Sequence, residues 1–133
     1  MIVCTSLVLF GCSNASLESG DESEVKNLLT EYSNLSPAKL GGPKELKNVK
    51  AINSIDVGQI VESKWTKMGC KDCKDTDASI NATTAYGTTE TITYQVRKMD
   101  GKWMLTGFKN SSGERGNFYP FLDLDVIKAR ASL

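Results

Sequence analysis

Two strand-like segments joined by an Asp-Gly pair constrain the fold of this chain more than any other feature. From Thr88 to Lys98, apolar residues recur at every second position, at Ile92, Tyr94 and Val96. This is the period of a strand with one buried face. Asp100-Gly101 follows directly and is a pair preferred in two-residue type I′ turns. The sequence therefore predicts a β-hairpin, with its return strand over Lys102 to Asn110.

A two-residue turn also sets which residues face one another across this hairpin. We expect the pairs Met99 with Lys102, Lys98 with Trp103, Val96 with Leu105 and Tyr94 with Gly107. In this register the apolar side chains of both strands share one face. A sheet covered by a helix requires that arrangement.

Further strands are predicted before the hairpin. Ala78 to Tyr86 alternates between its two faces, and Val49 to Trp65 is rich in Val and Ile, with Gly58 marking a bulge or break. The polar segments Thr66 to Asp77 and Asn110 to Asn117 are expected to be loops.

One amphipathic helix is expected ahead of these strands. Ser19 and Glu22 have the spacing of a capping box, and apolar residues then recur at helical intervals, at Val25, Leu28, Leu29, Tyr32 and Leu35. Ser36-Pro37 should end the helix, and residues 37–47 read as a loop with room for one short turn.

The C-terminal segment from Phe118 to Ile127 is markedly apolar, and Pro120 is placed to open a short final helix. We expect the segment to close the core or cover a sheet edge, the alternative being an exposed segment that binds a partner. The predicted fold class is α+β, with the N-terminal helix packed on a curved antiparallel sheet.

Composition excludes some classes of function. The 133 residues hold 16 basic and 16 acidic side chains, so no basic excess favours nucleic-acid binding. No histidine is present, which removes the commonest general base and the commonest zinc ligand. We expect no metal and no other cofactor.

The first ten residues are uncharged and mostly apolar, and Gly11-Cys12-Ser13 follows them. The segment Leu9-Phe10-Gly11-Cys12 resembles the lipobox of bacterial lipoproteins. This resemblance implies cleavage after Gly11 and a diacylglycerol and acyl lipid, such as palmitate, on Cys12. Before residue 26 the chain has no Lys or Arg, whereas signal peptides usually begin with basic residues. The alternatives are therefore a start upstream of Met1 or an apolar N-terminal strand.

The lipoprotein resemblance implies an organisation and a location. Residues 1–11 form the signal peptide, residues 12–20 the lipidated cysteine and a flexible tether, and residues 21–133 a single domain. The domain is expected to be extracytoplasmic and attached to the cell membrane or outer membrane. A protein of the cell envelope is its expected partner.

The segment TAYGTTETITYQVRKMDGKWMLTGF, from Thr84 to Phe108, resembles the last hairpin of small secreted lipoproteins with a cystatin-like or nuclear-transport-factor-like domain. The likeness extends over Ser23 to Phe108. It implies a cystatin-like or cone-shaped fold with a concavity between helix and sheet, and it assigns no activity.

Cys70 and Cys73 form a Cys-x-x-Cys pair. Outside the cytoplasm the pair is expected to form a structural disulfide, the alternatives being free thiols or a redox centre. Cys4 falls in the predicted signal peptide.

No motif marks a catalytic group. Asp56, Glu62, Glu90 and Tyr94 are the candidates for acid–base chemistry, and Tyr32, Trp65, Tyr94 and Trp103 are candidates to line a pocket or to fill the core. We predict a non-catalytic binding module. The alternative is a small enzyme or small-ligand binder that uses a pocket between helix and sheet.

Overall fold

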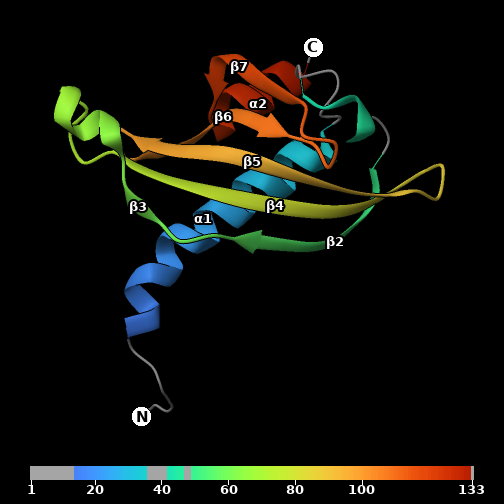
Figure 1. Cartoon of the computed structure of the whole chain (residues 1–133), viewed down its shortest axis with the longest axis horizontal. Coiled ribbons are helices and arrows are strands. Elements are labelled where there is room, and N and C mark those ends of the chain that lie inside the picture. The colour runs from blue at the N-terminus through green and yellow to red at the C-terminus, as the bar shows by residue number, and fades with distance from the viewer. Residues whose placement is uncertain (1–13, 36–41, 47–48, 133) are drawn as a thin grey trace.

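A computed structural model describes residues 14–35, 42–46 and 49–132 of the chain. It confirms the predicted α+β class: a helix packs on an open antiparallel sheet of six strands, and a short helix follows at the C-terminus (Figure 1). The predictions for residues 1–13, which include the signal peptide and Cys12, lie outside the described residues, as does Ser36-Pro37.

The long helix α1 (Asn14–Asn34) carries the predicted apolar stripe. Val25, Leu28, Leu29 and Tyr32 are all buried against the sheet. The helix begins before Ser19, however, so the predicted capping box does not start it and the backbone of residues 14–20 is helical rather than a flexible tether. Residues 15–19 contain neither Pro nor Gly, and a helix fixed by packing farther along extends readily through such a segment. The 3-10 turn η2 (Lys44–Leu46) confirms the short turn expected in the following loop.

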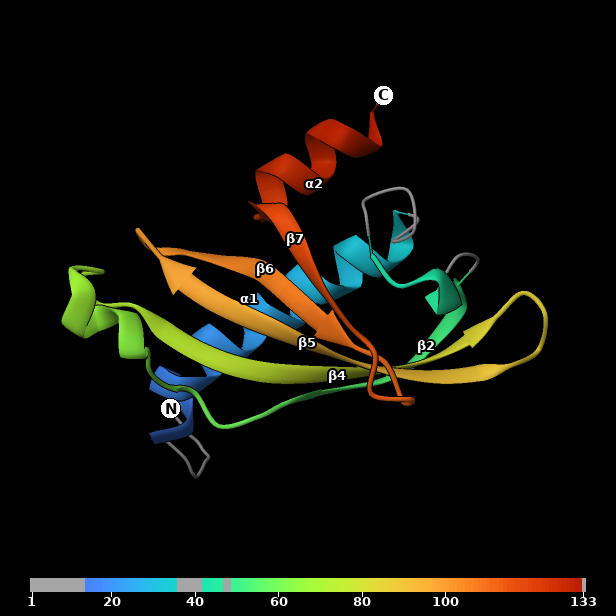
Figure 2. The ribbon, with the colours of Figure 1, turned by 45° about the horizontal axis from the view of Figure 1, so that its top comes forward.

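The strands are β2 (Val49–Val57), β3 (Val61–Glu62), β4 (Lys74–Thr84), β5 (Thr89–Met99), β6 (Lys102–Lys109) and β7 (Arg115–Leu122). Their order in the sheet is β2-β4-β5-β6-β7, and β3 pairs with β4 beyond the end of β2. The long strands β4 and β5 bend along their length, and α1 crosses one face of the sheet diagonally (Figure 2).

The predicted hairpin is confirmed near its turn. Both Asp100 and Gly101 have positive φ, as a type I′ turn requires, and the first predicted pairs, down to Val96 with Leu105, are present. Beyond them the register shifts, so that Tyr94 faces Phe108, and the predicted pairing of Tyr94 with Gly107 is wrong. The shift leaves Thr106 unpaired, and its hydroxyl donates to the backbone oxygen of Gln95.

The segment predicted as a loop over residues 66–77 is shorter than expected. Its first residues belong to the 3-10 helix η3 (Lys64–Met68), and its last residues belong to β4, which begins at Lys74. Residues 74–77 are mostly charged, and Thr76 is the one buried residue among these four, so the sequence carries little sign of a strand there. The Thr76 hydroxyl donates to the oxygen of Gly58 at 3.1 Å. Trp65, expected at the end of a strand, lies in η3.

Pro120 does not open a helix, contrary to prediction. It lies within the edge strand β7, where a missing backbone N–H is tolerated. The final helix α2 (Leu124–Ala131) begins later because the Asp123 side chain accepts a hydrogen bond from the Val126 N–H. The burial of Phe118, Leu122 and Ile127 confirms that this tail closes the core and covers a sheet edge.

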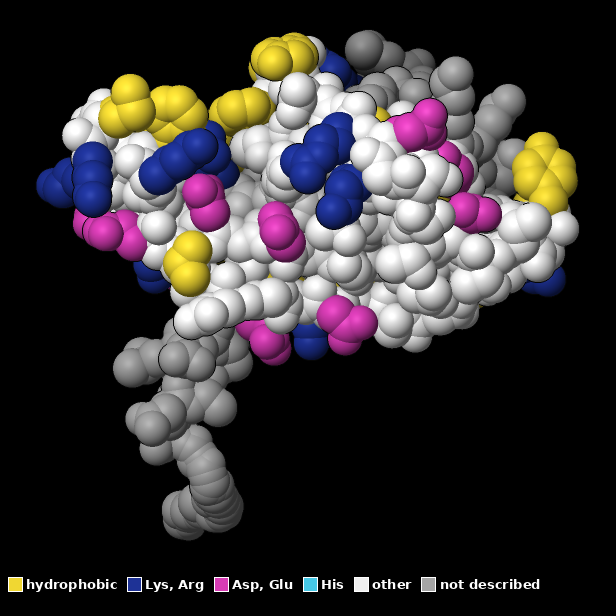
Figure 3. Space-filling model, in the orientation of Figure 1, with side chains coloured by type: hydrophobic (Ala, Val, Ile, Leu, Met, Phe, Trp, Pro, Cys, Tyr) yellow, Lys and Arg dark blue, Asp and Glu magenta, His cyan; other side chains and the backbone are white. Residues whose placement is uncertain are grey.

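The two faces of the sheet differ in chemistry. The inner face meets α1 through the buried side chains of β4, β5 and β6. The outer face, turned to the viewer in Figure 3, carries scattered charged side chains, among them the pair of Asp75 with Arg97, between uncharged polar ones. Hydroxyl and amide groups bond to one another there, as in Ser79 with Thr93 at 2.9 Å and Asn81 with Thr91 at 2.9 Å. Such an alternation of buried apolar and outward polar side chains is typical of an antiparallel sheet with one face exposed to solvent.

Candidate functional site

A carboxylate on α1 joins the helix to one end of the sheet. Asp21 accepts hydrogen bonds from Lys98 Nζ at 2.8 Å, Trp103 Nε1 at 3.2 Å and Lys74 Nζ at 3.2 Å. We call these four residues the Asp21 cluster. The side chain of Asp21 is 14% exposed and that of Lys98 24%, so both charges are largely withdrawn from water. Ion pairs at such sites are screened less than surface pairs.

The cluster shifts the pKa of both Asp21 and Lys98. Burial alone raises the pKa of Asp21, but the hydrogen bonds from Lys98, Trp103 and Lys74 outweigh burial and place the pKa below the ordinary 3.8. The hydrogen bond to Asp21 raises the pKa of Lys98 above 10.5, against the opposing effect of burial. The carboxylate and the ammonium therefore both stay charged at neutral pH.

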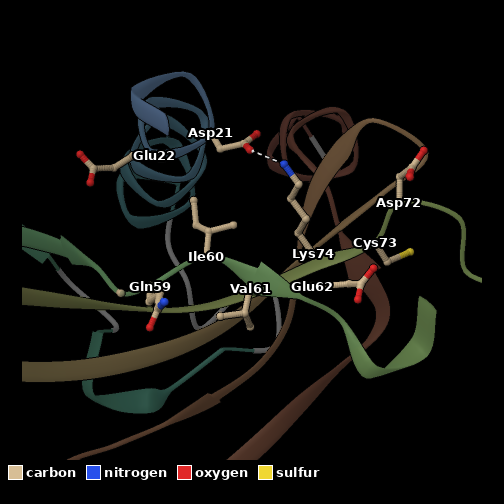
Figure 4. Close-up of a pocket in the computed structure, with 10 residues that line it drawn as sticks. Asp21, Glu22, Gln59, Ile60, Val61, Glu62, Asp72, Cys73 and Lys74 are labelled. Atoms are coloured by element: carbon tan, nitrogen blue, oxygen red, sulfur yellow. Dashed lines mark hydrogen bonds and ion pairs between the residues drawn. The ribbon is translucent and has the colours of Figure 1, made fainter. Parts of the chain in front are cut away.

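Beside the Asp21 cluster lies an open groove of about 680 Å³, which we call the end groove. It is formed by α1, by β3 with the link that precedes it, and by the end of the disulfide loop with the start of β4. Its lining residues are Asp21, Glu22, Gly58, Gln59, Ile60, Val61, Glu62, Asp72, Cys73 and Lys74. Ile60 points towards α1, whereas Gln59 and Val61 point away from it (Figure 4). Ile60 thus gives the groove an apolar patch, and charged side chains lie around it.

The charge of the end groove is acidic. Four carboxylates line it against one ammonium, that of Lys74, which is already paired with Asp21. Neither Glu62 nor Asp72 takes part in an ion pair between described residues. A cationic group with an apolar stem, such as a Lys or Arg side chain, matches this combination.

Two local features shape the groove. The Gly58 N–H donates to the oxygen of Asp77 at 2.8 Å, and a Cβ on Gly58 would lie 2.8 Å from the same oxygen. Only glycine therefore permits this close passage between β2 and β4. On the other side the structure joins Cys70 to Cys73 by a disulfide, with the Cα atoms 5.7 Å apart. The Cys73 oxygen accepts from the N–H of Ser63 at 2.9 Å and so ties this loop to the residue after β3.

The four aromatic residues predicted to line a pocket or fill the core lie in different parts of the structure. Tyr32 and Tyr94 are fully buried and pack edge to face, with ring centroids 5.4 Å apart. Trp65 stands on η3 and is 37% exposed. Trp103 is nearly buried and borders a second hollow of about 290 Å³ between α1, the hairpin turn and the start of α2. Tyr32 and Tyr94 are therefore part of the core between helix and sheet.

Both buried phenols remain neutral. Burial raises the pKa of Tyr32 and Tyr94, and for Tyr94 the neighbouring Tyr32 adds to the shift. The two rings interact, but no hydrogen bond of acceptable geometry joins either hydroxyl to a described residue. These are core side chains with unsatisfied oxygens rather than groups presented to a ligand.

The acid–base candidates do not come together. Glu62 faces Lys74 at one end of β4, and Glu90 faces Ala82 eight residues farther along, roughly 26 Å away at about 3.3 Å per residue. Asp56 is exposed on β2 and Tyr94 is in the core. Of these candidates, Glu62 alone lines the end groove.

Sequence reasoning missed the Asp21 cluster, although a signal for it was present. Lys98 has the same strand parity as Ile92, Tyr94 and Val96, so its side chain must start on the inner face. An inward lysine needs a carboxylate partner. Asp21, on α1, supplies it.

Among the described residues, no three His, Cys, Asp or Glu side chains are grouped to hold a metal ion. In that same part of the chain, no helix combines the length and apolar character needed to cross a bilayer. In comparisons with known proteins, no protein-family model, no curated protein and no solved structure matches this chain.

Proposed function

We propose that this chain is a bacterial lipoprotein acylated on Cys12, whose α+β domain acts in the cell envelope as a non-catalytic binding module. The lipobox-like Leu9-Phe10-Gly11-Cys12 supports the anchor. The diagonal helix on a bent antiparallel sheet supports a cystatin-like or cone-shaped domain. Acyl chains on one cysteine contribute about 0.8 kcal/mol per buried methylene, enough to hold such a domain on a membrane.

The observation that carries the binding role is the end groove. Ile60 forms an apolar patch in it, its rim is acidic, and Glu62 and Asp72 have no ion-pair partner among the described residues. We propose that it receives a basic side chain, with its aliphatic stem, from an envelope protein. Opposite charges on a rim act mainly on the rate and specificity of such an encounter.

A peptide titration tests this role. The probe is acetyl-Lys-Leu-Lys-amide, added to isotope-labelled full chain carrying Cys12→Ala and followed by amide chemical shifts. We expect shifts at Gly58 to Glu62 and at Cys73 and Lys74. With the double substitution Glu62→Gln and Asp72→Asn, binding should weaken about five- to tenfold, because two rim charges are lost.

The matched control is Asp56→Asn with Glu90→Gln, which removes two carboxylates outside the end groove. This variant should bind like the parent chain. Equal shifts with acetyl-Glu-Leu-Glu-amide, or shifts confined to other surfaces, would contradict the proposed role of the groove.

The anchor has its own test. In bacteria grown with an alkyne fatty acid, the parent chain should take up the label and Cys12→Ala should take up none, because the acyl groups need that sulfur. Cys4→Ala is the matched control, since the proposed cleavage removes Cys4, and it should label like the parent. Undiminished labelling of Cys12→Ala would end the lipoprotein proposal.

A further inference from the structure

The strongest unused surface is the tip formed by η3 and the disulfide loop, residues 64–73, which we call the η3 tip. In a 3-10 helix, side chains three positions apart lie above one another. Trp65 and Met68 therefore form one row and Lys64 and Lys67 the next. Trp65 is 37% and Met68 74% exposed, and hydrophobic and basic side chains lie together over this end of the molecule in Figure 3.

Local backbone contacts define the form of the tip. Ser63 caps η3 by accepting from the Trp65 N–H, and Gly69, with φ 98°, ends it. The Cys70 N–H then donates to the Trp65 oxygen at 3.0 Å, and the disulfide closes the loop. The backbone of η3 thus places Trp65 and Met68 in one row at the tip.

The charge around the apolar row is predominantly basic. Lys64, Lys67 and Lys71 are exposed and belong to none of the ion pairs between described residues. Lys64 Nζ and the Arg97 guanidinium each lie 5.6 Å from the Trp65 ring centroid. Asp72 lies within the tip and Glu62 just before it, and both carboxylates border the end groove. An amphipathic Trp beside Met and several Lys suits the boundary between lipid headgroups and acyl chains.

The position of the tip agrees with this chemistry. Figures 1 and 2 both place the first turns of α1 and η3 at the same end of the sheet. The pair of Lys74 with Asp21 ties the start of β4, just after the disulfide loop, to α1 seven residues after its start. The proposed anchor at Cys12 would therefore bring this end towards the bilayer.

We propose that the η3 tip docks on the surface of an anionic lipid bilayer, inserting Trp65 and Met68 at the headgroup level while Lys64, Lys67 and Lys71 meet lipid phosphates. This deepens the proposed membrane attachment, because the tip would fix the orientation of the anchored domain. Its chemistry does not depend on acylation, so it can be tested without the lipid.

The test uses the full chain with Cys12→Ala and vesicles of phosphatidylcholine, alone or with one quarter phosphatidylglycerol. We expect cosedimentation with the anionic vesicles that falls as salt is raised. The chain holds two tryptophans, and Trp103 is buried, so a blue shift of emission on binding reports Trp65. Lys64→Gln, Lys67→Gln and Lys71→Gln together should weaken partitioning at least about tenfold, because each lysine near an anionic surface contributes about fivefold.

Two matched controls distinguish the tip from net charge and from aromatic exposure elsewhere on the surface. Lys50→Gln, Lys102→Gln and Lys109→Gln together change the net charge equally on β2 and β6 and should bind within about twofold of the parent chain. Trp65→Ser should weaken binding, whereas Tyr119→Ser, at a residue 82% exposed on β7, should not. Residues 1–11 are present in every variant, so their contribution cancels.

The outcomes separate this inference from the anchor. Equal binding of the parent chain and the tip triple variant, or no emission change on anionic vesicles, would overturn docking by the η3 tip, whatever the labelling of Cys12 shows. Vesicle binding that persists in the absence of fatty-acid labelling would support the tip as a membrane surface in its own right.

Discussion

Replacing Tyr94 by alanine is expected to lower the free energy of unfolding by about 3–5 kcal/mol, since a fully buried aromatic ring is lost from the centre of the sheet. The ring packs edge to face on Tyr32 and contacts Phe108, so its removal leaves a cavity between α1 and β5. Urea unfolding followed by circular dichroism measures the change.

Tyr94→Phe is the matched comparison. It keeps the ring and removes an oxygen that has no hydrogen-bond partner among the described residues, so we expect a change within about 1 kcal/mol, in either direction. Should Tyr94→Phe be as damaging as Tyr94→Ala, the hydroxyl would have a polar role and the residue would belong to a site rather than to the core.

Replacing Asp21 by alanine is expected to lower the free energy of unfolding by about 2–3 kcal/mol. The substitution leaves the Lys98 ammonium and the Trp103 N–H largely withdrawn from water without their acceptor. Glu22→Ala is the control, because Glu22 is 48% exposed in a pair with Lys26 at 3.6 Å, and it should cost no more than about 0.5 kcal/mol. Equal effects of the two substitutions would contradict the Asp21 cluster as a stabilising unit.

The same cluster predicts how stability depends on pH. The pKa of Asp21 is lower in the folded state than its ordinary 3.8, so its contribution is present above that value and is lost as pH falls through the lower, folded pKa. The pKa of Lys98 is raised, so its contribution is complete below 10.5 and is lost as pH rises through the higher, folded pKa. The difference between parent and Asp21→Ala should therefore be constant near neutral pH and shrink in strong acid.

The hairpin could be predicted because its determinants are local. A period of two and an Asp-Gly turn set the pairs from Met99 with Lys102 to Val96 with Leu105 without reference to the rest of the chain. The shift at Gln95 could not be predicted in this way. It depends on the Thr106 hydroxyl finding a backbone acceptor on the neighbouring strand and on the Phe108 ring reaching the core.

The candidate site was harder to predict than the fold. The end groove is assembled from α1, from the link between β2 and β3 and from β4, and the contacts of Asp21 with Lys74 and Lys98 span 53 and 77 residues. Glu62 and Asp72 line the groove because of the path that the backbone takes after Gly58 and through the disulfide loop. Neither residue carries a local signal of that role.

The early start of α1 limits how far the domain could lie from a lipid on Cys12. Asn14 stands two residues after Cys12, a stretch of at most about 7 Å, and Asp21 lies seven helical residues farther on, about 10 Å at 1.5 Å per residue. A domain acylated at Cys12 would therefore stay close to the membrane surface. It would contact only molecules that come within a few nanometres of the lipid. Partners deep in the periplasm or far outside the cell would have to be brought to it.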